Sequence, residues 1–163
     1  MEAHVEGRNY LLIDVYNVIH AIPSLRKRLT DGLDSAREAL ADAVLPIHDG
    51  EGFHVVLVLD SGNDRVETDY PYGKKTFEYL YAPAALSADG AIERVIARLP
   101  NPSGAYAASN DNMVRESIRA LGANALRPEE LMDWAAGCRD RMQRDLVRKR
   151  QQAAKEWGNR LEF

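Results

Sequence analysis

The chain is poor in residues that cross-link a fold or bind soft metals. It has one cysteine, Cys138, in 163 residues, which excludes an intramolecular disulfide and a multi-cysteine metal site. We expect Cys138 to pack as a small apolar side chain. The four histidines are scattered, without the close pairing that is typical of zinc sites: His4, His20, His48 and His54.

Long apolar runs are also missing. No stretch approaches the roughly 18 to 20 apolar residues that span a bilayer, and no basic segment followed by an apolar core marks a signal peptide at the N-terminus. With 163 residues and 45% hydrophobic content, the chain is long enough for one compact domain and too short for two ordinary ones. We therefore expect a cytoplasmic protein with a single domain over residues 1–163 and no membrane partner.

Charge is distributed unevenly. The net charge is −4, but residues 139–160 hold eight basic and three acidic side chains, so this segment carries +5 and the remainder −9. We predict a basic helical extension over residues 139–163. An acidic body with a basic helix is compatible with holding phosphates at one place and a metal ion at another. A solvated helical face explains the same segment equally well.

Short apolar runs alternate with helical periodicity along the chain. We expect strands at residues 10–13, 54–59, 76–81, 105–108 and 124–126, and helices at 34–45, 87–99, 112–121 and from 128 onward. Strands that alternate with helices indicate a parallel sheet covered on both faces. The fold class is therefore α/β, a three-layer α/β/α sandwich with a central, mainly parallel sheet.

Four acidic residues follow these strands or begin the helix after one: Asp14, Asp60, Asp89 and Asp111. Because such positions meet at one edge of a parallel sheet, the carboxylates are expected to share a pocket. Two like charges about 4 Å apart repel by about 1 to 4 kcal/mol, which raises carboxylate pKa values or recruits a cation. Mg²⁺ or Mn²⁺ suits such an oxygen ligand set.

Other polar side chains accompany these acids. Asn17, three residues after Asp14, could position a metal-bound water or a phosphate. Glu93 lies four residues after Asp89 and so shares its helix face. Ser109 and Asn110 directly precede Asp111 and could support it as ligand, donor or cap. Turns, caps and helix-dipole contacts are the structural alternatives for this whole set.

Four segments occur in the order of a known family: LLIDVYNVIHAIPSLR (11–26), HVVLVLD (54–60), LSADGAIERVI (86–96) and YAASND (106–111). Together they resemble the NYN domain proteins of the PIN-like nuclease superfamily, most closely the YacP-like bacterial branch. Two positions depart from the pattern. Val15 stands where many relatives have Gly, and Asn110 stands where many PIN-like proteins have Ser.

The resemblance implies a PIN-like (NYN) fold and Mg²⁺- or Mn²⁺-dependent endoribonuclease activity, used in RNA processing or decay. By position, the metal-binding acids would be Asp14, Asp89 and Asp111, with Asn17 as the NYN asparagine and Asp60 as the acid after the second strand. We expect in-line phosphodiester hydrolysis with one or two divalent ions. Asp60 or Glu93 would assist as a further carboxylate.

RNA preference must come from surfaces outside such a site, because the chemistry needs no base contacts. Basic residues that could line a track for single-stranded RNA are Arg26, Lys74, Lys75, Arg144 and Arg148. We also expect a protein or ribonucleoprotein partner to gate access, because a nuclease active on any transcript would be hazardous in the cytoplasm.

Two alternatives compete with the nuclease. One is a catalytically inert RNA-binding or assembly module with the same fold, which the retained carboxylates disfavour. The other is a phosphatase of the haloacid-dehalogenase type, which also uses an Asp after the first strand. That chemistry needs a second Asp two residues later, where this chain has Tyr16.

Overall fold

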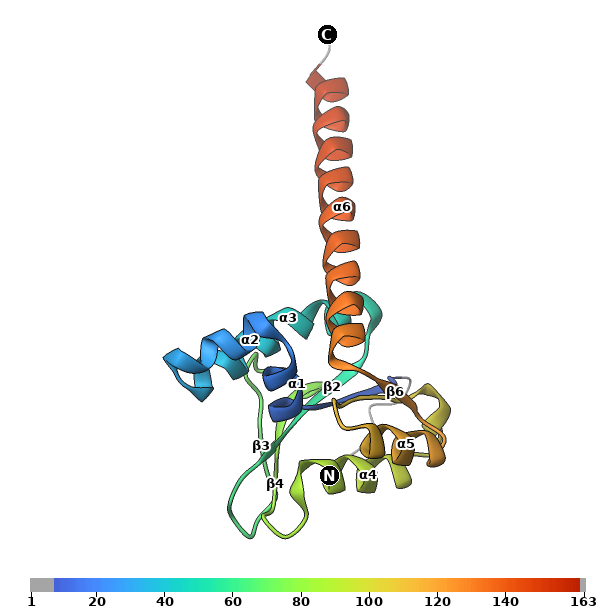
Figure 1. Ribbon diagram of the computed structural model, residues 1–163. Helices are drawn as coiled ribbons and strands as arrows, with labels where there is room; N and C mark the ends of the chain where they lie inside the picture. Colours follow the sequence, from blue (N-terminus) through green and yellow to red (C-terminus); the bar gives the residue numbers. More distant parts are fainter. Residues whose placement is uncertain (1–7, 162–163) are drawn as a thin grey trace.

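The computed structural model describes residues 8–161, so the two predicted domain limits lie outside the described residues. A six-stranded sheet with the order β3-β4-β2-β1-β5-β6 forms its centre (Figure 1). All neighbouring strands are parallel except β3 and β4, which confirms the mainly parallel sheet. The strands are β1 (Tyr10–Asp14), β2 (His54–Asp60), β3 (Glu67–Asp69), β4 (Phe77–Ala82), β5 (Tyr106–Ala108) and β6 (Asn124–Leu126).

Helices cover both faces of the sheet. One face packs against α1 (Val15–Ala21), α2 (Pro23–Arg28), α3 (Leu33–Glu51) and the first turns of α6 (Pro128–Leu161). The other face packs against α4 (Ser87–Ala97) and α5 (Asn112–Ala120). Short 3₁₀ helices occupy Leu29–Asp31 and Pro102–Gly104. The arrangement is a three-layer α/β/α sandwich.

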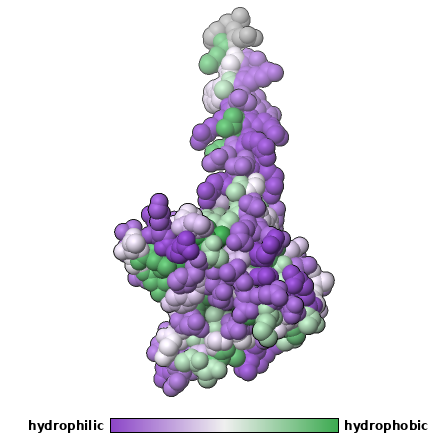
Figure 2. Space-filling view, in the orientation of Figure 1, coloured by the Kyte–Doolittle hydropathy of each residue, from purple (hydrophilic) through white to green (hydrophobic). Residues whose placement is uncertain are grey.

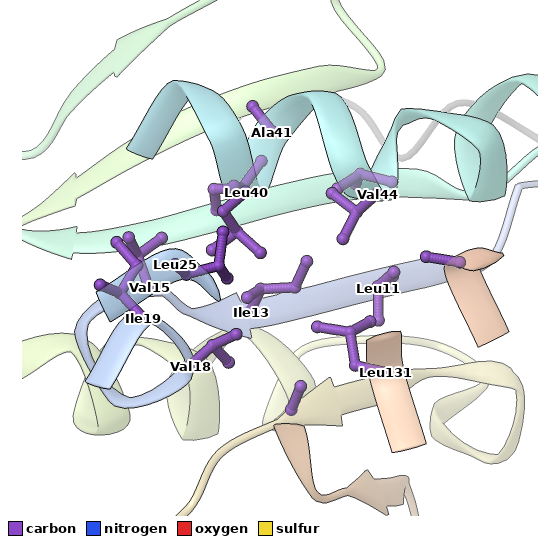
Figure 3. Close-up of a cluster of buried hydrophobic side chains, with 14 of the residues drawn as sticks. Leu11, Ile13, Val15, Val18, Ile19, Leu25, Leu40, Ala41, Val44 and Leu131 are labelled. Carbon is purple, nitrogen blue, oxygen red and sulfur yellow. The ribbon is translucent and has the colours of Figure 1, made fainter. Parts of the chain in front are cut away.

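Alternating side chains of the central strands fill two cores. Leu11 and Ile13 of β1 point toward α1 and α3, where they join Leu40 and Val44 (Figure 3). Leu12 belongs to the cluster on the α4 and α5 face. Because both faces of β1 and β2 are covered, their sequences are continuous apolar runs rather than alternating ones. This explains why both strands could be predicted from short apolar runs in the sequence.

Four elements differ from the sequence prediction. The helices α1 and α2 were not predicted, because seven and six residues are too few to show a helical period. The predicted helix 34–45 continues to Glu51 through Pro46, although proline removes a helix hydrogen bond; burial of Val44 and Ile47 on the sheet compensates. β3 is an exposed three-residue edge strand and carries no apolar alternation.

The strand order places a topological switch point between β1 and β5. From β1 the chain builds β2 and β4 on one side, and α4 then carries it across to β5 and β6 on the other. Connections therefore diverge at the carboxyl ends of β1 and β5, which is where open α/β sheets bind ligands. Asp14 ends β1, and Ser109–Asp111 directly follow β5.

The last part of α6 projects away from the domain (Figure 1). Leu131, Ala135 and Cys138 are buried, whereas every residue from Arg139 to Leu161 is exposed. The burial of Cys138 fits its expected packing role. Within residues 8–161, no helix combines the length and the hydropathy that a membrane span requires.

Removal of residues 144–163 is expected to leave the free energy of unfolding within about 1 kcal/mol of the full chain, because the described residues of this segment bury no side chain. Leu131→Ala, which removes a fully buried side chain on the same helix, should lower the free energy of unfolding by about 2 to 5 kcal/mol. Urea denaturation measures both. A truncation as harmful as Leu131→Ala would show that the projecting segment belongs to the folded core.

Candidate active site at the carboxyl edge of the sheet

The Asp14 carboxylate is the most buried acidic group at the switch point. Its residue is only 3% exposed, and its Oδ2 accepts a hydrogen bond of 2.7 Å from Asn17 Nδ2. Asn17 can reach back because α1 starts directly after Asp14 and brings residues three apart onto one side. Val15 is the first helical residue, and Ser87 is the one non-glycine residue with positive φ in the described chain. A β-branched residue is therefore compatible with this turn.

Burial and neighbouring acids act together on Asp14. Burial raises the pKa of the Asp14 carboxyl to about 6, hydrogen bonds from Asn17 oppose this rise, and the negative charges of Asp89 and Asp60 add to it. Asp60 ends β2 and is exposed, while Asp89 lies half-buried in the first turn of α4. Asp89 and Asp60 are thus close enough to act electrostatically on Asp14.

Asp111 has a structural role that is visible directly. It is the N-cap of α5, and its Oδ1 accepts hydrogen bonds from the backbone N–H groups of Met113 (2.9 Å) and Val114 (3.4 Å). Within the described residues, Oδ2 of Asp111 accepts no hydrogen bond, which leaves an exposed oxygen for a ligand. The buried Ser109 hydroxyl accepts the Asp111 N–H at 3.2 Å and fixes the turn. Asn110 is exposed.

The start of α4 places Asp89 and Glu93 one turn apart on the same helix face, both half-buried. The Ser87 hydroxyl donates a hydrogen bond to Asp89 Oδ1 and accepts the Gly90 N–H at 3.4 Å. Ser87 is the first residue of α4, and Leu86 precedes it as the N-cap residue. The φ of 63° at Ser87 is uncommon for a residue with a side chain.

Arg115 was missed by the sequence prediction. Its guanidinium donates hydrogen bonds to the Ser109 carbonyl oxygen (3.0 Å) and to Asn112 Oδ1 (3.4 Å). A half-buried cation therefore lies beside the turn that presents Asp111. The spacing of four residues from Asp111 could have indicated it, because residues four apart in a helix share a face.

The donor chemistry of this site fits a hard divalent cation. Asp14, Asp60 and Asp89 offer carboxylate oxygens, and the negative charges of Asp60 and Asp89 near Asp14 favour a bound positive charge. Within residues 8–161, no three His, Cys, Asp or Glu side chains lie close enough together to enclose a metal ion. Mg²⁺ commonly takes only one or two carboxylates and completes its shell with waters and substrate phosphate oxygens. The arrangement fits that open kind of site.

The basic residues predicted to bind RNA fall into three groups. Arg26 lies on α2, the helix that follows α1. Lys74 and Lys75 precede β4, and Lys74 pairs at 3.3 Å with Asp49 near the end of α3. Arg144 and Arg148 lie on the projecting part of α6. Because Arg144 and Arg148 lie on the part of α6 that is fully exposed, the five residues do not form one continuous track through the candidate site.

Asp14→Asn is expected to stabilise the protein at high pH in the presence of EDTA. The folded-state pKa of about 6 lies above the ordinary value of 3.8, so the contribution of Asp14 to stability is full below pH 4 and is lost as the pH rises through 6. The variant should gain up to about 3 kcal/mol at pH 8 and much less at pH 4. Urea denaturation at both pH values measures this, with the exposed Asp140→Asn as control. An equal effect at the two pH values would contradict the raised pKa.

Comparison with known proteins places this geometry in a family. The YacP-like NYN domain matches residues 11–162 of the chain. Two similar solved structures are both of Rae1 (YacP) from Bacillus subtilis, and one of them is a single-residue mutant. The mutant has a TM-score of 0.71 and 23% identity over 88% of this chain and 84% of that one. The other has a TM-score of 0.69 and 23% identity over 93% and 88%.

No curated protein matches the chain significantly. The family match, however, extends over nearly all of the described residues and includes every candidate site residue. The chain therefore belongs to the YacP-like NYN domain family, a nuclease-like family with an RNA-related function.

Proposed function

We propose that the chain is a Mg²⁺- or Mn²⁺-dependent endoribonuclease that hydrolyses phosphodiester bonds in single-stranded RNA. The observation that carries this proposal is the buried Asp14 carboxylate, oriented by Asn17 and raised in pKa partly by the charges of Asp89 and Asp60. A carboxylate kept next to like charges at a switch point is destabilising unless a cation joins it. Family membership adds independent support.

Each side chain has a definable task in this reaction. Asp14 and Asp89 would hold the ion, with Asp60, Glu93 or the unbonded Oδ2 of Asp111 as further oxygen ligands. When bound, the ion would supply Lewis-acid polarisation of the phosphate and a more acidic water. Asn17 fixes the orientation of the Asp14 carboxylate. Arg115, beside the turn after β5, offsets the negative charge that develops on the phosphate.

The burial of Asp14 favours a single-stranded substrate. At 3% exposure, its carboxylate is reached only by a phosphate that approaches closely from the open edge of the sheet. A flexible single strand can bring a phosphodiester close to this edge, whereas the backbone of a duplex is stiffer and both its strands must fit. Access through a protein or ribonucleoprotein partner remains part of the proposal.

A second candidate function is RNA binding without turnover. It is favoured by two observations: Asp111 caps α5, and within residues 8–161 no three acidic or other ligating side chains surround a common point. An inert module would retain the fold and its basic surfaces. The two functions differ in whether RNA is cut.

Cleavage of end-labelled single-stranded RNA by the purified chain with Mn²⁺ or Mg²⁺ tests the proposal. We expect products that disappear with EDTA and that fall by at least about 100-fold in Asp14→Asn. Asp140→Asn, an equal charge change on an exposed part of α6, should retain full activity. Since Asp14→Asn is not expected to unfold the protein, its inactivity would report on chemistry. Binding of RNA without any cleavage would favour the inert module.

Asp111→Asn separates the capping role from the catalytic role of that residue. Asn caps helices about as well as Asp, so the free energy of unfolding should change by less than about 0.5 kcal/mol. Cleavage should nevertheless fall by at least about tenfold if the carboxylate charge contributes to metal binding. Assays of cleavage and of urea denaturation on the same preparation decide this. Unchanged cleavage would restrict Asp111 to capping.

A further inference from the structure

The projecting part of α6 carries a line of cations on one face. Arg141, Arg144, Arg148 and Lys155 are separated by three, four and seven residues. In an α-helix these spacings return to the same side, and the line extends for about 21 Å. We call these four residues the basic stripe. All four are exposed.

The basic stripe is only partly neutralised by the protein. Arg141 pairs with Glu51 at 3.0 Å, which ties one end of the stripe to the last residue of α3. Arg148 makes one long contact of 4.0 Å with Asp145. Arg144 and Lys155 make no ion pair within residues 8–161. Most of the positive charge of the stripe is therefore available to a partner.

Aromatic and apolar side chains lie away from the basic stripe. Viewed down the helix, the opposite side carries Met142, Leu146, Ala153, Trp157 and Leu161. Figure 2 shows the projecting helix as mostly hydrophilic, with a few separate hydrophobic residues. Between the four cations, the stripe has glutamines at 151 and 152 and no aromatic ring. It offers charged and amide groups but no surface on which a base could stack.

The basic stripe is remote from Asp14. Helix α6 begins after the carboxyl end of β6. Arg141 pairs with Glu51 near the start of β2, which is at the opposite edge of the sheet. The seven residues of β2 separate the two edges by about 23 Å, and the rest of the stripe leads further away. A phosphate held by Arg144 is thus not the phosphate that lies at Asp14.

We infer that the basic stripe docks the chain on the phosphate backbone of double-helical RNA, at a contact separate from the site of cleavage. The inference rests on the proposed function in that the docked RNA belongs to, or adjoins, the molecule that is cut. Cations on a straight, rigid helix suit the regularly placed phosphates of a duplex, which proteins recognise mainly through shape and backbone. Binding of single strands relies on aromatic rings placed among the cations, and the stripe has none.

A membrane surface fits the helix less well. An amphipathic helix that lies in a bilayer interface needs a continuous apolar face. Here Lys149 and Arg150 interrupt the apolar side between Leu146 and Ala153. Charge complementarity without a continuous apolar face favours the polyanionic backbone of RNA.

Fluorescence anisotropy with a labelled RNA hairpin of about 16 base pairs and a single strand of the same length tests the inference on the full chain. Arg144→Glu with Arg148→Glu should weaken hairpin binding by at least about tenfold and reduce the salt dependence by about two phosphate contacts. Lys149→Glu with Arg150→Glu is the matched control, because it changes the net charge equally on other faces of the same helix. It should weaken binding several-fold less.

Three outcomes would overturn the inference: equal weakening by both pairs, which reports net charge alone; absence of hairpin binding by the unaltered chain; or binding to phosphatidylglycerol vesicles in place of the hairpin. If the unaltered chain binds the hairpin through the stripe but cuts no RNA, the proposed nuclease fails and the docking contact stands. If the unaltered chain cuts RNA but its binding to the hairpin does not depend on the stripe, the proposed nuclease stands and the docking contact fails.

Discussion

The Asp14 carboxylate is held at the end of a strand whose side chains are all buried, and there it is surrounded by charges of its own sign. The hydrogen bond from Asn17 fixes its direction, while burial, Asp89 and Asp60 disfavour its ionisation. This unfavourable environment of the ionised carboxylate depends on the whole fold. The sheet order opens the connections at β1 and β5, α1 returns Asn17 to the strand end, and α4 brings Asp89 across from β4. A cation would relieve the repulsion between the carboxylates.

The two edges of the sheet have different chemical character. The carboxyl edge holds Asp14 with Asp60 and Asp89 near it, and Arg115 lies beside the turn after β5. The amino edge leads into the basic stripe, which stands clear of the body on a rigid helix. Separate placement keeps the cations of the basic stripe from neutralising the acids near Asp14. The net charge of −4 conceals this division.

The central strands and the fold class could be predicted from the sequence, because strands buried on both faces have continuous apolar sequences. Helices α1 and α2 could not, since short helices are set by packing against α3 rather than by periodicity. For the site, the placement of Asp14 and Asp60 at the carboxyl ends of β1 and β2 could be predicted from the apolar runs that precede them. The capping bonds of Asp111 and the contact of Arg115 with Ser109 depend on backbone geometry after β5, which residue types do not specify. The distance of Arg144 from Asp14 could not be predicted, because the sequence does not give the direction in which α6 leaves the domain.

The most direct test of this account is the pKa of Asp14, measured by carbon-13 NMR of its carboxyl group with and without Mg²⁺. The account predicts a pKa near 6 in EDTA and a clear fall when Mg²⁺ is added, because the ion binds the ionised form. The resonances of exposed Asp140 should not respond. A pKa near the ordinary value of 3.8 in EDTA, or one that Mg²⁺ leaves unchanged, would contradict the claim that Asp14 organises a metal-dependent site.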